Sequence, residues 1–210
     1  MNGLASDEDR TIPHEDWHIM TFIDAILGVS SDQQGCIVEA GCFKGVSGAK
    51  FSLIARSLGR ELHLFDSFEG LPINDEAHDK SIIGHSIRGW FEGGKYIGTY
   101  ERVMRTLELC GAPEVCHLHK GWFENTMPHF KEPVVAAYLD CDLASSTKTC
   151  LRYIYPLLVP GGFIVSQDGD FPLVIDVFKD QSFWEKEVGA TMPEISGLGL
   201  SKMIIVRKPI

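Results

Sequence analysis

Short apolar runs and stretches with apolar residues at helical spacing alternate along most of this chain. The apolar runs predict strands at 36–41, 61–66, 114–121, 134–140, 163–168 and 202–208. Helical spacing predicts helices at 15–27, 49–59, 99–111, 145–158 and 173–189. Strands that alternate with helices are typical of an α/β fold, a mostly parallel sheet with helices on both faces. The link 190–201 allows an antiparallel closing hairpin, although its first strand is weak.

Two segments fall outside this alternation. Residues 1–34 hold the leading helix and the polar loop after it, and residues 68–98 are rich in glycine, histidine and charge without steady periodicity. A loop of that length within a compact domain is usually functional or disordered. No break in composition divides the 210 residues, so we expect a single domain over 1–210.

The composition argues against several classes of partner. The net charge is -10, and no run of lysine or arginine forms a patch that neutralises phosphates, so we expect no nucleic acid. No apolar stretch approaches the roughly 20 residues of a membrane helix, and the first ten residues are acidic where a signal peptide is basic. We therefore expect a cytoplasmic protein that does not enter a membrane. Its six cysteines form no C-x-x-C pair, which predicts reduced, buried thiols rather than disulfides or zinc ligands.

The first predicted strand ends in a glycine turn that opens a helix. The pattern from Glu39 to Gly45 is E-x-G-x-x-x-G, which differs from the dinucleotide fingerprint G-x-G-x-x-G. It suits S-adenosylmethionine, because Gly41 permits close backbone approach and Glu39 can accept from the ligand's ammonium group. Asp66, which ends the second strand, is placed to bind both ribose hydroxyls. The alternative is that the glycines only form a tight turn and Asp66 caps the loop after it.

Acidic residues also end two later strands. Asp140 and Asp168 follow apolar runs that we expect to be neighbours in the sheet, so their side chains would converge. Oxygen ligands at adjacent strand ends are typical of a site for a hard divalent ion such as Mg2+. Asp142 is then either the base that takes a proton from an acceptor hydroxyl or the cap of the helix that begins near Ala144.

Aromatic residues and histidines supply further candidates. Aromatic faces suit sugars and aglycones. The candidates for an acceptor pocket are Trp90, Phe91, Tyr96 and Trp122. The alternative is that these rings fill the core. His85 in the long loop and His119 near a strand end are alternative bases, and each is more often an ordinary polar residue.

Five motifs follow one another in a specific order, VEAGCFKGVSG, LFDSFEGLP, HKGWFENTMP, LDCDLASST and IYPLLVPGGFIV. From Val38 to about Asp168 they resemble the TylF-type macrocin O-methyltransferases. The resemblance implies a Rossmann-like class I methyltransferase fold, S-adenosylmethionine as methyl donor and dependence on magnesium. It also implies a hydroxyl of a sugar or glycosylated metabolite as acceptor, in a small molecule or an oligosaccharide. Relatives are often oligomeric, so we expect a homodimer by analogy.

The resemblance also assigns roles to individual residues. Those that would surround the donor are Glu39, Gly41, Gly45, Ser47, Asp66, Ser67, Phe68, Gly121 and Trp122. Asp140 would be a metal ligand, and Asp142 matches the acid implicated as base. Where the family has two adjacent acids, this chain has Gln167 and Asp168, so one predicted metal ligand is an amide. Asp170 is an alternative carboxylate for that position.

Three functions are compatible with these residues. The first is a magnesium-assisted sugar O-methyltransferase in which the loop 68–98 closes over the acceptor as a lid. The second is a catechol-type phenol O-methyltransferase that uses the same metal. The third is a donor-binding module without turnover, which Gln167 in place of an acid favours.

Overall fold

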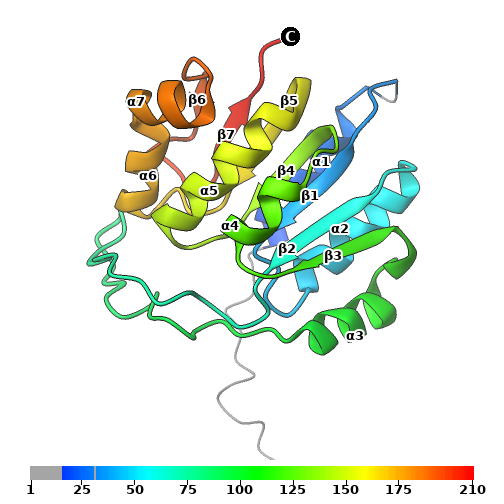
Figure 1. Ribbon diagram of the computed structural model, residues 1–210, viewed down its shortest axis with the longest axis horizontal. Helices are drawn as coiled ribbons and strands as arrows, with labels where there is room; N and C mark the ends of the chain where they lie inside the picture. The colour runs from blue at the N-terminus through cyan, green and yellow to red at the C-terminus, as the bar shows by residue number, and fades with distance from the viewer. Residues whose placement is uncertain (1–15, 31) are drawn as a thin grey trace, which may run out of the picture.

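A seven-stranded sheet forms the centre of the computed structural model, which describes residues 16–30 and 32–210 (Figure 1). The strand order is β3-β2-β1-β4-β5-β7-β6. The strands are β1 (Cys36–Ala40), β2 (Leu62–Asp66), β3 (Cys116–Lys120), β4 (Val134–Leu139), β5 (Leu158–Ser166), β6 (Ile195–Ser196) and β7 (Ile204–Arg207). The predicted helix start at Glu15 and the acidic first ten residues lie outside the described residues.

The first five strands run parallel, and the order reverses between β1 and β4. In open α/β sheets, ligands bind beyond the carboxyl ends of the strands at such a switch point. β7 runs antiparallel to β5, and the two-residue β6 pairs with β7 in the closing hairpin. The predicted α/β fold with a mostly parallel sheet is therefore confirmed, including the weak first strand of the hairpin.

Helices cover both faces of the sheet, with α4, α5 and α6 on one side and α1 and α2 on the other (Figure 1). The α-helices are α1 (Asp16–Leu27), α2 (Val46–Ser57), α3 (Tyr100–Cys110), α4 (Phe123–Thr126), α5 (Ala144–Ile154), α6 (Pro172–Lys179) and α7 (Gln181–Phe183). The single turns are the 3-10 helices η2 (Pro113–Val115), η3 (Met127–His129) and η4 (Tyr155–Leu157) and the π-helix η5 (Trp184–Val188). One buried apolar cluster contains Phe178 and Trp184, and the other contains Phe22 and Phe51.

Two predicted boundaries differ from the structure. β5 begins at Leu158, so the segment expected to stop a helix is already strand. Its two glycines exchange backbone hydrogen bonds with Lys208, which extends the sheet to this point. The predicted helix 173–189 divides at Asp180, whose carboxylate accepts from the amide of Phe183 and so starts a new turn.

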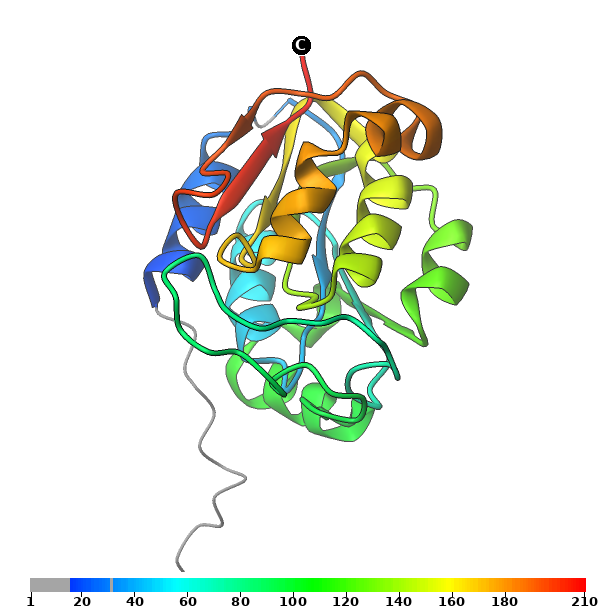
Figure 2. The ribbon, with the colours of Figure 1, turned by 90° about the vertical axis from the view of Figure 1, so that its left-hand side faces the viewer.

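The segment 67–98 contains no helix or named strand, as predicted (Figure 2). It passes across the carboxyl ends of the strands, and the Ile82 amide donates to the Asp170 carbonyl oxygen at 2.9 Å. All six cysteines are free thiols; Cys110 is exposed and Cys116 is partly buried, so burial holds for the other four. Within the described residues, no helix combines the length and apolarity needed to cross a membrane.

Candidate active site

The turn between β1 and α2 leaves no room for a side chain at Gly41. This residue has a φ of 83°, and a Cβ atom on it would lie 2.0 Å from the backbone oxygen of Asp140. The Asp140 amide donates to the Ala40 carbonyl oxygen at 2.9 Å. The turn and the end of β4 are therefore in direct backbone contact at the switch point. Glycine is required here by this contact as well as by its backbone conformation.

Glu39 is fully buried in β1, and neither carboxylate oxygen has a hydrogen-bond partner among the described residues. Burial raises the pKa of Glu39 to about 8, and the Ser47 side chain opposes this rise. The carboxylates of Asp140 and Asp66 add to it. A buried acid without a partner is unfavourable in its charged form unless a cation approaches. The position therefore fits the ammonium group of a bound donor.

Asp66 holds the backbone of the site together. One carboxylate oxygen accepts from the amides of Cys42 at 2.8 Å and Phe43 at 3.1 Å. The other accepts from the Phe68 amide at 2.8 Å, so Asp66 does cap the loop after it, while the other half of that alternative, glycines that serve only a tight turn, stays a prediction. A carboxylate offers about four acceptor sites, and three are used here. Its contact with ribose hydroxyls stays a prediction.

The remaining predicted donor residues lie around the same edge. The Gly121 amide at the end of β3 donates to the Asp66 carbonyl oxygen at 3.0 Å, and Trp122 precedes α4. Ser67 donates to the Gly70 carbonyl oxygen at 2.8 Å. Gly45, Ser47 and Phe68 flank these turns, at the start of α2 and after β2. The structure thus gathers all nine predicted donor residues at the carboxyl ends of β1, β2 and β3, and their binding roles stay predictions.

Asp140, Asp142 and Asp168 meet just beyond β4 and β5. One carboxylate oxygen of each lies within 4.8 Å of the others. The predicted convergence of Asp140 and Asp168 is confirmed. One Asp168 oxygen accepts from the amides of Cys141 at 3.0 Å and Asp142 at 3.1 Å. The other is buried and has no hydrogen-bond partner within the described residues, as expected of an oxygen that can ligate an ion.

The three acids repel one another inside the protein. Burial raises the pKa of Asp168 to about 8, and the Asp140 carboxylate adds to the rise. Burial, followed by the charges of Asp168 and Asp140, raises the pKa of Asp142 well above its ordinary value. Lys202, in the turn before β7, lowers the pKa of both acids, but both pKa values remain above their ordinary values. A divalent cation would relieve this repulsion, so the cluster fits magnesium.

Glu76, from the long loop, caps α5. Its two carboxylate oxygens accept from the amides of Ala144 at 2.7 Å and Ser145 at 2.8 Å. Leu143 occupies the N-cap position and makes no side-chain cap. The alternative that Asp142 caps this helix is therefore wrong. Asp142 instead has a φ of 61°, a strained conformation that aspartate tolerates better than most residues.

Gln167 and Asp170 are the other two predicted candidates for metal ligands. The Gln167 side-chain oxygen accepts from the buried Tyr138 hydroxyl at 2.9 Å, so it already has one partner. Asp142 is a third carboxylate beside Asp140 and Asp168. Burial raises the pKa of Asp170. Metal binding by Gln167 or Asp170 stays a prediction.

The predicted acceptor aromatics divide into two groups. Phe91 is buried, with its ring centroid 4.8 Å from that of Phe171, so for Phe91 the core alternative is confirmed. Tyr96 is 41% exposed, and its pKa is raised by partial burial and then by the charges of Asp142 and Asp140. Trp90 is exposed and Trp122 partly buried. Of the four candidates, Tyr96 is the one whose pKa the acids raise.

The two candidate histidine bases have other surroundings. His119 stacks on Phe65 with ring centroids 4.0 Å apart, and its Nε2 lies 2.9 Å from Nδ1 of His63. His85 is exposed in the long loop. These contacts favour Asp142 as the base.

A family model provides the deciding comparison, because macrocin O-methyltransferase (TylF) matches residues 18–196. The chain belongs to this family. A solved structure titled as that of the O-methyltransferase NovP has the same fold, with a TM-score of 0.71 at 20% identity over 92% of this chain and 79% of that one. The resemblance to TylF-type enzymes and the class I methyltransferase fold are thus confirmed.

Two curated relatives are similar to this chain. One is the 8-demethyl-8-(2,3-dimethoxy-alpha-L-rhamnosyl)-tetracenomycin-C 4'-O-methyltransferase of Streptomyces olivaceus, 29% identical over 173 residues, 79% of this chain and 64% of the relative. The other is the mycinamicin III 3''-O-methyltransferase of Micromonospora griseorubida, 28% identical over 149 residues, 66% of this chain and 56% of the relative. The matches therefore span less than two thirds of either relative.

Proposed function

We propose that this chain is an S-adenosylmethionine-dependent O-methyltransferase that acts on a hydroxyl of a sugar or glycosylated small molecule, assisted by magnesium. The observation that carries the proposal is the meeting of Asp140, Asp142 and Asp168 beside the Gly41 turn. The Streptomyces olivaceus relative is named for a rhamnosyl compound, which supports a sugar acceptor. Membership of the TylF family supports the reaction class.

On the donor side, the chain supplies a tight turn and two buried carboxylates. The bound donor would carry the methyl group on a sulfonium, which is a good leaving group. Glu39 would accept from its ammonium group and regain a counter-charge, and the acceptor capacity left on Asp66 would serve the ribose. Because direct displacement needs little acid or base help at the sulfonium, positioning by this turn contributes most.

On the acceptor side, Asp140 and Asp168 would hold the magnesium ion, which lowers the pKa of a bound hydroxyl. Asp142 would take the proton, because its carboxylate lies beside the two acids that would hold the ion and the acceptor hydroxyl. Tyr96 would pack against the acceptor ring. The loop 68–98, fixed to α5 through Glu76, would exclude water from the reaction.

The test is methyl transfer by the purified chain to a panel of rhamnosides and catechols, with magnesium or with a chelator. We expect transfer to a rhamnoside, lost with the chelator and restored by magnesium. Transfer to catechols alone would favour the phenol enzyme. Donor binding by calorimetry without transfer to any acceptor would favour a binding module and contradict the proposal.

A further inference from the structure

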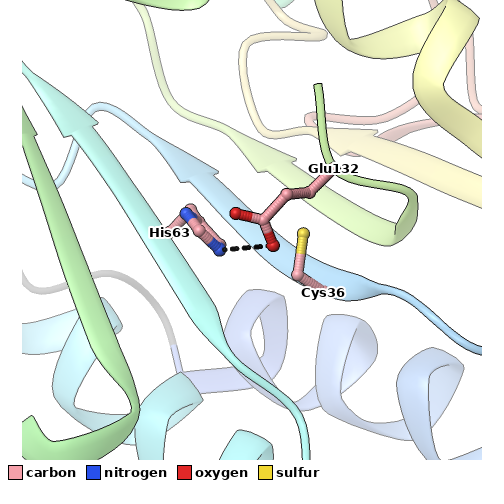
Figure 3. A group of neighbouring side chains, drawn as sticks. All are labelled: Cys36, His63 and Glu132. Atoms are coloured by element: carbon pink, nitrogen blue, oxygen red, sulfur yellow. Dashed lines mark ion pairs between the residues drawn. The ribbon is translucent and has the colours of Figure 1, made fainter. Parts of the chain in front are cut away.

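Three metal-binding side chains meet at the amino end of the sheet, which is the edge opposite the acids (Figure 3). Cys36 opens β1, His63 lies near the start of β2, and Glu132 stands just before β4. Their ligand atoms all lie within 4.8 Å of one another, and the three strands are consecutive neighbours in the sheet. We propose that Cys36, His63 and Glu132 form a zinc site.

His63 is oriented as a metal ligand. It is 3% exposed, and its Nε2 is buried without a hydrogen-bond partner among the described residues. The Nδ1 atom of the same ring lies 2.9 Å from Nε2 of His119, which fixes the ring from behind. Zinc-bound histidines usually have such a partner on the second nitrogen, since it sets the tautomer and orientation.

The distance between Nε2 of His63 and Oε2 of Glu132 is 3.4 Å. Two ligands of a tetrahedral zinc with bonds of about 2.0–2.1 Å stand about 3.3 Å apart, so this pair already has the spacing of a coordination edge. The Glu132 side chain is 56% exposed, whereas Cys36 is buried. An ion can therefore enter past Glu132, and a water molecule can fill the fourth position.

The donor set selects the metal. A thiolate, an imidazole and a carboxylate suit zinc, whereas magnesium takes oxygen ligands. In the absence of metal, burial raises the pKa of Cys36 to about 12, and its Sγ lies 3.3 Å from the Pro133 carbonyl oxygen. Zinc would replace the thiol proton, which passes to solvent. The bound ion would link the starts of β1, β2 and β4, independently of methyl transfer.

The alternative interpretation needs no metal. The thiol would donate to Pro133, His63 would form an ion pair with Glu132, and the group would only stabilise packing. The two interpretations differ in whether Cys36 becomes a thiolate when a metal is added. Cobalt distinguishes them, because it replaces zinc in tetrahedral sites and a cobalt–thiolate bond gives an intense charge-transfer absorption.

The experiment titrates the reduced, chelator-treated chain with Co2+ in saturating Mg2+, so that the aspartates are occupied. We expect one Co2+ per chain with the thiolate absorption, and its loss when Zn2+ is added. Cys36→Ser should abolish the absorption. Glu132→Gln, at an exposed side chain that tolerates substitution, should weaken cobalt binding at least about tenfold, since even outer-shell changes at metal sites have effects of 10–100-fold.

Glu61→Gln is the matched control. The Glu61 carboxylate is 52% exposed and lies 2.8 Å from a histidine, His117, but it is not one of the three ligands. Cobalt affinity should therefore stay unchanged in this variant. The proposal is overturned if the wild type shows no thiolate absorption, if Cys36→Ser keeps it, or if Glu132→Gln binds cobalt as tightly as Glu61→Gln does.

Discussion

The two ends of the same parallel sheet carry opposite kinds of donor atom. At the carboxyl end, three aspartates offer only oxygen, whereas at the amino end a thiol and an imidazole stand with one carboxylate. Oxygen donors suit a hard ion such as magnesium, and sulfur with nitrogen suits zinc. We therefore expect the two proposed sites to prefer different metals, because their donor atoms differ.

The backbone also differs between the two ends. All four non-glycine residues with positive φ among the described residues lie around the carboxyl end, and they are Phe43, Phe68, Tyr96 and Asp142. At the amino end, Cys36 and His63 lie within strands and have no positive φ, although the pairing of β1 with β4 shifts register between Cys36 and Ile37. Strained backbone concentrates at functional sites, where the surrounding contacts hold it. The difference indicates a chemically active end and a structural end.

The largest expected effect is that substitution of Asp140 impairs the magnesium site and leaves the site at the amino end unchanged. Asp140→Asn should lower magnesium-dependent methyl transfer at least about a hundredfold, because it removes a direct ligand and outer-shell losses already reach 10–100-fold. Donor affinity, measured by calorimetry, should change only a few-fold, and the cobalt absorption at the amino end should be unchanged. Asp176→Asn, an exposed acid on α6, is the control. If Asp140→Asn lost both the magnesium-dependent methyl transfer and the cobalt absorption, the two ends would not be independent metal sites.

The next effect compares the glycines that flank β1. A Cβ atom on Gly41 would lie 2.0 Å from a backbone oxygen, whereas one on Gly35 would lie 3.0 Å from the Pro133 oxygen. Both have positive φ, at 83° and 145°. We expect Gly41→Ala to lower the free energy of unfolding by more than about 3 kcal/mol and Gly35→Ala by about 1–2 kcal/mol. Chemical denaturation measures both, and equal losses would contradict the argument.

The two ends should also respond to pH with opposite sign. Burial raises the pKa of Glu39 from its ordinary value of 4.5 to about 8 in the folded state, so the folded state holds the extra proton and stability falls as pH rises from about 4.5 to 8. His63 has a pKa lowered to about 4, chiefly by burial, so stability falls as pH drops from 6.5 to about 4. Glu39→Gln should remove the part of the first loss that Glu39 causes, since Asp168 also has a pKa raised to about 8, and His63→Gln should remove the second loss.

Thermal melts of both variants across pH 4 to 9 measure this effect, which is on the order of a few kcal/mol because one pKa unit corresponds to about 1.36 kcal/mol. Each variant serves as the control for the other. If Glu39→Gln does not raise the melting temperature at high pH, the claim that Glu39 is buried without a partner is contradicted. The same variant should lose donor affinity, which separates function from stability.

The smallest expected effect concerns Glu76. Glu76→Gln weakens the cap on α5 and should lower the free energy of unfolding by about 1 kcal/mol, as loss of a cap does. Amide exchange at Ala144 and Ser145 should rise. Glu69→Gln, an exposed acid of the same loop, should change neither. Unchanged exchange in Glu76→Gln would contradict the capping role.

Much of the carboxyl end could be predicted because each element contributes locally readable signals. An apolar run that ends in an acid predicts both the strand and the position of its carboxylate, as for Asp140 and Asp168. Glu76 and Lys202 had no such signal, since they reach the site from a loop without periodicity and from the turn before β7. The start of β5 was missed because Pro160 and Gly161 are typical of a turn, whereas pairing with the C-terminal strand overrides that preference.

The amino end could not be predicted for a different reason. Cys36 and His63 lie in β1 and β2 and Glu132 just before β4, and the order of these strands in the sheet does not follow the chain. Single cysteines and histidines in apolar runs are ordinary core residues, and only the register of β1, β2 and β4 brings these together. From the sequence, Cys36 could therefore be predicted only as a buried thiol. Its grouping with His63 and Glu132 can be recognised only in the folded structure.

Besides the packing of Phe91 on Phe171, two sets of hydrogen bonds anchor the long loop just past β4 and β5. Glu76 is tied to the first residues of α5, and Ile82 to the main chain at Asp170. Releasing a methylated product by lifting this loop would break contacts next to Asp142 and Asp168 themselves. Product release and weakening of metal binding would then occur together. The rate of product release would depend on the bound ion as well as on the size of the product.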